Sequence, residues 1–213
     1  DGSVWISTLG AGIARLERSN WLTFDDKNGL ANKITFGIGQ DSANAYWVGT
    51  YGGGAMRFAD GVWTKFDTAT GLPNDYVHCF LATKNADGKD IFYIGTERGL
   101  AKFENGNISK VDLSAEKIEE IWDLHESTEA DGSKSIWIIG SGGVIKINKD
   151  KKTLYTTKEG LPETRVRSIL ETVSADGKKT LWFATFGGLA KFEDEKFTVF
   201  NTNNGLPNNR VYS

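Results

Sequence analysis

One short segment with an aromatic residue at its centre recurs through the chain at a nearly constant interval. The central residues are Trp5, Trp47, Tyr93, Trp137 and Trp182, and the intervals between them are 42, 46, 44 and 45 residues. A repeat of about 40–45 residues is typical of a four-stranded β-propeller blade. We therefore expect each repeat to fold as one small antiparallel sheet.

Two further motifs keep the same phase. The first is a pentad that occurs in every repeat and consists of glycine, an apolar residue, a residue of any type, a basic residue and an apolar residue. The second is Gly-Leu-Pro, which ends several repeats. The pentads are Gly12–Leu16, Gly54–Phe58, Gly99–Phe103, Gly143–Ile147 and Gly188–Phe192. Gly-Leu-Pro occurs at 71–73, 160–162 and 205–207, with a degenerate copy at 29–31. The 25 glycines against three prolines also favour short strands joined by tight turns.

The β-branched and aromatic runs divide each repeat into four strands, here called A to D. In the last full repeat the expected strands are 166–171, 181–185, 188–192 and 197–200. The strands are apolar on both faces near their centres, so neighbouring sheets must cover them. We expect an all-β propeller or partial propeller over 1–213, with four full blades and two partial ones. The blade segments are 1–31, 32–73, 74–117, 118–162, 163–207 and 208–213.

Two architectures are open at this point. The chain, which starts at the A–B turn Asp1-Gly2, is either a slice of a larger propeller or a five-bladed ring in which the strand at 210–213 joins residues 3–25. An open slice would expose strand edges and an apolar blade face, so we expect it to self-associate.

Charge and cysteine content exclude several classes of function. A net charge of -3 over 213 residues gives no basic surface for nucleic acid, and the single Cys79 forms neither an internal disulfide nor a paired-cysteine zinc site. No run approaches the roughly 18 apolar residues of a transmembrane helix, so no membrane contact is expected from this segment. No metal or cofactor is predicted.

The motifs resemble the two-component regulator propeller repeat over essentially the whole chain. The clearest copies are 47–66 and 181–211, whereas the third repeat departs with Tyr93 and no Gly-Leu-Pro. The resemblance implies seven-bladed propellers in the extracytoplasmic sensor regions of bacterial two-component receptors, and hence a periplasmic or extracellular location. It implies a non-catalytic sensor that binds an environmental ligand or a partner domain. A protein interaction scaffold is the alternative.

Catalytic motifs are sparse. His78 and Cys79 are adjacent on an expected strand, which sends them to opposite faces, and His125 has no second histidine at helical spacing. We interpret both histidines as ordinary strand residues and expect no enzyme activity. A propeller lyase or glycoside hydrolase, the less favoured alternative, would need clustered histidine, tyrosine and arginine or paired carboxylates at the channel.

Several loop motifs are better explained as turns. Residues 51–54 lack the following helix and Lys-Ser/Thr pair of a phosphate loop, and the Asp-Gly segments near 87, 131 and 176 supply too few carboxylates for calcium. The pentad also carries a basic residue in each repeat, whose recurrence favours an architectural role. Its long stem would cover apolar surface while its charge reaches water. These residues are Arg15, Arg57, Lys102, Lys146 and Lys191.

A ligand site is expected where the repeat varies, on the face shared by the D–A and B–C connections. Residues just before strand A are Lys33, Tyr76, Glu120, Arg165 and Arg210, and those just after are Thr35, His78, Trp122, Arg167 and Tyr212. Asn74, Asp75, Asn208, Asn209, Tyr51, Arg98 and Phe186 belong to the neighbouring loops. Aromatic, arginine and amide side chains suit a small molecule or oligosaccharide, including carboxylated glycans. The alternative is a solvated loop rim with no small-molecule site.

Overall fold

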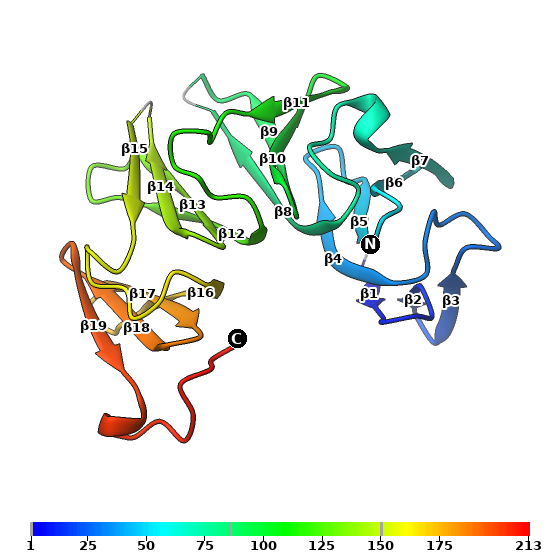
Figure 1. Cartoon of the computed structure of the whole chain (residues 1–213). Helices are drawn as coiled ribbons and strands as arrows, with labels where there is room; N and C mark the ends of the chain where they lie inside the picture. Colours follow the sequence, from blue (N-terminus) through cyan, green and yellow to red (C-terminus); the bar gives the residue numbers. More distant parts are fainter. Residues whose placement is uncertain (1, 86, 150) are drawn as a thin grey trace. The chain divides into compact units, whose positions relative to one another are not determined.

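The computed structural model describes residues 2–85, 87–149 and 151–213, and their regular structure is nearly all β-strand (Figure 1). Asp1 of the expected first turn and Ala86 of an expected Asp-Gly turn lie outside the described residues. The strands form one three-stranded sheet and four four-stranded sheets, each with neighbouring strands in chain order. This confirms the predicted all-β class and antiparallel strand order.

The chain divides into two compact units, 1–112 and 113–213. The first unit holds three sheets. They are β1 (Val4–Ser7), β2 (Ile13–Glu17) and β3 (Asn20–Phe24); β4 (Thr35–Gln40), β5 (Tyr46–Thr50), β6 (Ala55–Ala59) and β7 (Val62–Phe66); and β8 (Val77–Lys84), β9 (Asp90–Thr96), β10 (Gly99–Glu104) and β11 (Asn107–Val111). A short 3₁₀ turn, η1 (Thr68–Thr70), follows β7.

The second unit holds two four-stranded sheets. They are β12 (Ile121–Thr128), β13 (Lys134–Gly140), β14 (Gly143–Asn148) and β15 (Lys151–Tyr155); and β16 (Val166–Val173), β17 (Lys179–Thr185), β18 (Gly188–Glu193) and β19 (Lys196–Phe200). A second 3₁₀ turn, η2 (Thr202–Asn204), follows β19. No helix in the described part of the chain is long and apolar enough to cross a membrane.

The strand B aromatic fills the space between successive sheets within each unit. In the first unit Trp47 is fully buried, and its ring centroid lies 5.1 Å from that of Phe92 and 4.9 Å from that of Phe103 in the following sheet. In the second unit Trp137 lies 5.7 Å from Phe183 and 5.6 Å from Phe192 in the same way. Burying rings of this size at the seams supplies much of the stability of each unit.

In four of the five pentads the opening glycine (Gly12, Gly54, Gly143 or Gly188) permits a close approach of strand C to the end of strand D. Gly54 has φ +80, and a Cβ atom there would stand 2.1 Å from the carbonyl oxygen of Phe66. Gly143 repeats the geometry, with a Cβ position 2.2 Å from the carbonyl oxygen of Tyr155. No side chain fits at either position, which explains why the pentad begins with glycine.

The basic residue of each pentad pairs directly with the aromatic residue on strand B. In register these pairs are Trp5–Arg15, Trp47–Arg57, Tyr93–Lys102, Trp137–Lys146 and Trp182–Lys191. The cation lies over the indole ring in four of them, at centroid distances of 5.4, 5.9, 5.2 and 5.9 Å for Arg15, Arg57, Lys146 and Lys191. All five cations also pair with a carboxylate. The recurring basic residue therefore contacts aromatic and acidic side chains of the blades themselves, as expected for an architectural role.

Each complete strand A contains one irregularity near its start. The pairing register shifts between Thr35 and Ile38, between Val77 and Cys79, between Ile121 and Asp123, and between Val166 and Ser168. A bulge of this kind leaves a residue outside the ladder and changes the direction of its side chain. The bulges place Phe36, His78, Trp122 and Arg167 outside the regular alternation.

Candidate functional site

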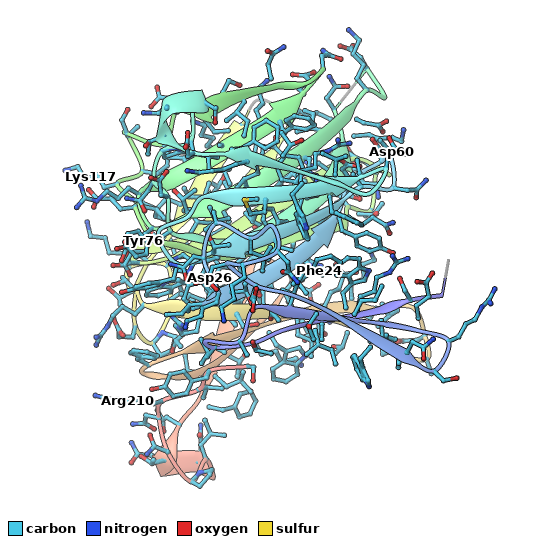
Figure 2. The ribbon with its side chains drawn as sticks, turned by 90° about the vertical axis from the view of Figure 1, so that its right-hand side faces the viewer. Phe24, Asp26, Asp60, Tyr76, Lys117 and Arg210 are labelled. Atoms are coloured by element: carbon cyan, nitrogen blue, oxygen red, sulfur yellow. The ribbon has the colours of Figure 1, made fainter. Side chains whose placement is uncertain are left out.

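The rim is formed by the ends of strands A and B that carry the D–A and B–C connections. In the first unit Tyr76 at this end and Asp60 in a C–D turn lie on opposite sides of the sheets (Figure 2). Isolated bridges join the residue after one strand B to the residue before the next strand A, as in Leu9–Ile34, Tyr51–Tyr76 and Ser141–Arg165. The rim thus has three repeating positions: after strand B, before strand A and at the bulge.

The strand register of the second sheet shows that its predicted rim residues were placed one position too early in the sequence. Thr35 pairs with Thr50 as Val77 pairs with Thr96, and its side chain is buried, with Oγ1 donating to the carbonyl oxygen of Gly12 at 3.0 Å. The rim residues of this sheet are therefore Ile34 and Phe36. Lys33 and Thr35, the residues expected from the sequence, occupy neither position.

A second correction concerns the B–C connection of the third sheet. The backbone N–H of Glu97 donates to the carbonyl of Tyr76, as that of Tyr51 donates to Ile34 and that of Phe186 to Arg165. Glu97 therefore holds the rim position after strand B. Arg98, which the sequence suggested, is exposed one residue further along the turn.

The predicted amide and acidic loop residues hold their own loops together. The Oδ1 atoms of Asn74 and Asn208 accept hydrogen bonds from the backbone N–H groups of Tyr76 and Arg210, both at 2.8 Å. Asp75 and Asn209 accept in the same way, at 2.8 Å, from the backbone N–H of the first residue of the 3₁₀ turn after strand D, Thr68 or Thr202. These side chains fix the path of the D–A connection, and so position the aromatic and basic rim residues.

In the first unit the rim is aromatic. The rings of Tyr51 and Tyr76 meet edge to face with centroids 4.5 Å apart, and Phe36 lies 5.9 Å from Tyr51 and 5.2 Å from His78. Tyr51 is 47% exposed, so the cluster presents a ring surface to solvent. Phe36 is the member that sequence reasoning missed.

In the second unit the rim is aromatic and basic. The guanidinium of Arg167 lies 4.4 Å from the ring centre of Trp122, both at bulge positions of neighbouring sheets. Glu120 stands just before strand β12, where its carbonyl oxygen accepts from the N–H of Ser141 at 3.0 Å. All three predicted residues lie at rim positions of this unit, and Trp122 and Arg167 contact each other.

The Phe186 cluster comprises Arg165, Phe186, Arg210 and Tyr212. Both guanidiniums lie over the Phe186 ring, at 5.0 Å for Arg165 and 5.8 Å for Arg210, and the Tyr212 ring centroid is 5.3 Å from that of Phe186. Arg165 also pairs with Glu163 at 3.0 Å, whereas among the described residues no carboxylate lies within 4.0 Å of the Arg210 guanidinium. Tyr212 is 58% exposed. The cluster offers a cation and ring faces to solvent.

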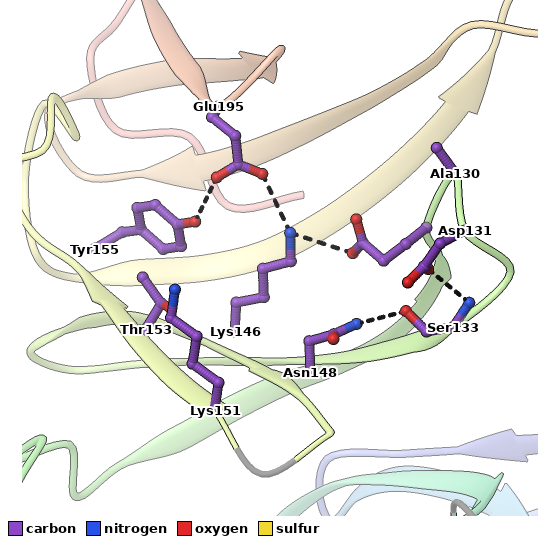
Figure 3. A pocket seen from close by; sticks show the side chains of 10 residues that line it. Ala130, Asp131, Ser133, Lys146, Asn148, Lys151, Thr153, Tyr155 and Glu195 are labelled. Atoms are coloured by element: carbon purple, nitrogen blue, oxygen red, sulfur yellow. Dashed lines mark hydrogen bonds and ion pairs between the residues drawn. The ribbon is translucent and has the colours of Figure 1, made fainter.

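A polar groove of about 500 Å³ lies elsewhere in the second unit, where the C–D turn of one sheet meets the other (Figure 3). Glu195 accepts from the Tyr155 hydroxyl at 3.0 Å and pairs with Lys146 at 3.2 Å, and Lys146 also pairs with Glu129. Burial and the neighbouring Glu195 raise the pKa of Tyr155 well above its usual range. Lys146 therefore links Glu129 of its own sheet to Glu195 of the other, and this charged network holds the two sheets together.

The remaining titratable residues of interest do not form a reactive cluster in the described part of the chain. His125 on β12 contacts Glu171 on β16, with Nε2 and Oε2 3.3 Å apart, and Cys79 is buried. Among the described residues no group of three or more histidine, cysteine, aspartate or glutamate side chains could hold a metal ion.

Comparison with known proteins rests on structure. No family model and no curated protein sequence matches the chain. Among solved structures, the extracellular domain assigned to the hybrid two component system BT3049 from B. thetaiotaomicron matches 98% of the chain with a TM-score of 0.71 and 22% identity. The corresponding domain of BT4673 from the same organism matches 94% with a TM-score of 0.61 and 18% identity. The chain has the β-propeller fold.

The same fold appears in proteins of other function. Virginiamycin B lyase from Staphylococcus aureus matches 93% of the chain with a TM-score of 0.62 and 16% identity. The chain spans 28% of the length of the BT3049 domain and 66% of the length of the lyase. The resemblance therefore establishes the architecture and leaves function to the residues of the rim.

Proposed function

We propose that this chain is the ligand-sensing propeller region of a bacterial two-component receptor of the regulator propeller repeat family, located in the periplasm or outside the cell. The repeated Trp-Ile/Val-Gly-Thr, pentad and Gly-Leu-Pro motifs support the family, and the structural similarity to extracellular domains of hybrid two-component systems supports the role. Repeated residues build the blades, whereas the rim positions differ from sheet to sheet, as recognition residues do on repeat scaffolds.

The Phe186 cluster is the proposed ligand site, and its two guanidiniums over one ring carry the proposal. Arginine binds carboxylates through two parallel N–H groups, and exposed aromatic rings stack on the apolar faces of sugars. The ligand class that meets both demands is a carboxylated glycan. Of the side chains in the cluster only the Tyr212 phenol could act as a general acid or base, and the cluster contains no histidine to act with it, so binding without catalysis is the function proposed for it.

Titration calorimetry with tetragalacturonic acid, and with a neutral tetrasaccharide as comparison, tests this function. We expect the acidic oligosaccharide alone to bind, and Arg210→Ala to weaken binding roughly 10- to 100-fold, as the loss of a charged hydrogen bond does. Lys196→Ala removes the same charge from an exposed position at the other end of β19, and should leave the affinity unchanged.

Two results would contradict the proposal. Equal binding of acidic and neutral oligosaccharides would remove the role of the guanidiniums. If no oligosaccharide bound and the folded chain instead retained a protein partner, a scaffold function would be favoured.

A further inference from the structure

The residues at the strand A bulges of neighbouring sheets contact each other in both units. In the first unit the rings of Phe36 and His78 have centroids 5.2 Å apart. In the second unit the guanidinium of Arg167 lies 4.4 Å from the ring centre of Trp122. The place of the contact is therefore a property of the fold, whereas its chemistry differs between the units, as expected of a recognition position on a repeat scaffold.

The Arg167 guanidinium has an aromatic ring on one face and no acidic partner. The side chain is half-buried, yet among the described residues no carboxylate oxygen lies within 4.0 Å of the guanidinium and no acceptor takes a hydrogen bond from it. Each of the five pentad cations, in contrast, pairs with a carboxylate. Stacking on Trp122 leaves the N–H edge of the guanidinium, which is the edge that binds a carboxylate through two parallel hydrogen bonds.

The neighbouring carboxylate of Asp123 holds the two bulges in place. Its Oδ2 accepts from the hydroxyl of Ser168 at 2.9 Å and from the backbone N–H of Ile169 at 3.1 Å, and its Oδ1 accepts from the N–H of the following residue at 2.9 Å. Both oxygens therefore bind neutral donors, and the positive charge of Arg167 stays available. The same bonds join β12 to β16 beside Trp122, which lowers the cost of ordering these side chains around a ligand.

We propose that Trp122 and Arg167 form a second carboxylate subsite, called the Arg167 subsite, for the glycan that the Phe186 cluster binds; this inference rests on the proposed function. Arg165 of the Phe186 cluster and Arg167 are two residues apart at the start of β16, so their Cα atoms are at most about 7 Å apart. One oligosaccharide can therefore place a carboxylate at each subsite. The ligand class narrows to a polyuronate, a glycan that carries carboxylates on more than one sugar residue.

Titration calorimetry with galacturonic acid and tetragalacturonic acid tests the Arg167 subsite. The monosaccharide has one carboxylate and occupies one subsite at a time, whereas the tetrasaccharide reaches both. We expect Arg167→Ala to weaken binding of the tetrasaccharide roughly 10- to 100-fold, as the loss of a charged hydrogen bond does. Binding of the monosaccharide should change much less, because the Phe186 cluster remains.

Two further variants separate the guanidinium from charge in general. Arg167→Lys keeps the positive charge but loses the two parallel N–H groups, so its affinity for the tetrasaccharide should lie between those of wild type and Arg167→Ala. Lys196→Ala removes a charge from the opposite end of β19 and should leave the affinity unchanged. Thermal unfolding of each variant checks folding, and Arg167→Lys carries the test if Arg167→Ala does not fold.

Arg210→Ala distinguishes failure of this inference from failure of the proposed function. If Arg210→Ala weakens binding of the tetrasaccharide and neither Arg167 variant does, the Phe186 cluster binds alone and the Arg167 subsite is wrong. An equal loss of affinity for the monosaccharide and the tetrasaccharide in Arg167→Ala would also overturn the second subsite. If the Arg167 variants weaken binding and Arg210→Ala does not, the Arg167 subsite is supported and the Phe186 site is wrong. Absence of binding to the wild-type chain would overturn both.

Discussion

Asp41 is a buried carboxylate that organises the seam around Trp47. Its side chain accepts from the Trp47 indole at 2.9 Å, from Arg57 Nε at 2.8 Å and from the backbone N–H of Ala45 at 2.9 Å. Burial opposes ionisation most strongly, but these hydrogen bonds and the Arg57 charge together outweigh it and lower the pKa of Asp41. The stabilisation from Asp41 is therefore present above its ordinary pKa near 3.8 and lost as the pH falls through the lower folded value.

We predict that Asp41→Asn lowers the free energy of unfolding of the first unit by about 3 kcal/mol at pH 7, because Arg57 is left without its buried partner. The difference from wild type should be constant above about pH 5 and shrink below pH 4. Urea unfolding at several pH values measures it. Asp60→Asn at a C–D turn is the matched control and should change little, because asparagine tolerates the positive φ of 51° found there. A loss that does not depend on pH would contradict the role of the charge.

At the scale of the element, the threonine that ends strand B closes the B–C turn. Thr50 Oγ1 donates to the Gly54 carbonyl at 2.8 Å and accepts from the Gly53 N–H at 3.1 Å, and the threonine is fully buried. Thr185 donates to the Gly188 carbonyl and accepts from the Gly187 N–H in the same way. Thr50→Val keeps the shape but leaves both backbone groups without this partner, and should cost about 1–3 kcal/mol.

Thermal unfolding followed by circular dichroism measures this cost. Thr198→Val on β19 is the control, since Thr198 is exposed on a strand where valine is at least as favourable, and its melting temperature should be unchanged or slightly higher. Equal melting of Thr50→Val and wild type would show that the hydroxyl contributes nothing net to the turn.

The elements also show how far the sequence predicts the rim. Strand identity followed from hydrophobic period and turn residues, both local properties. Strand A of the second sheet has six residues, whereas strand A of the other three complete sheets has eight, so the spacing kept by the other repeats does not locate its start, and Lys33 and Thr35 were placed where Ile34 and Phe36 lie. A signal was present: Asn32 precedes Thr35 by three residues, as Asn74 precedes Val77 and Asn208 precedes Val211. That asparagine caps the loop and marks the register.

At the scale of the whole molecule, sequence alone predicted the repeat and its burial pattern, because every sheet obeys the same packing rule. It did not predict which rim side chains meet. Arg165, Phe186 and Arg210 belong to three different connections of the second unit. Their spacing along the chain therefore does not predict that the two guanidiniums contact the Phe186 ring. Packing between neighbouring sheets restricts the repeated core positions and makes the blades predictable, but it does not restrict the variable positions of the rim.

The division into two units makes a prediction about how stability is distributed. In an array whose sheets contact mainly their neighbours, a core substitution destabilises its own region most. Trp47→Ala and Trp137→Ala each remove a ring that is at most 1% exposed and should cost about 3–5 kcal/mol locally. Hydrogen exchange should show lost protection in β4–β11 for the first variant and in β12–β19 for the second. If either variant lowered protection equally throughout the chain, the two units would unfold as one cooperative body, and the local energetic description would be wrong.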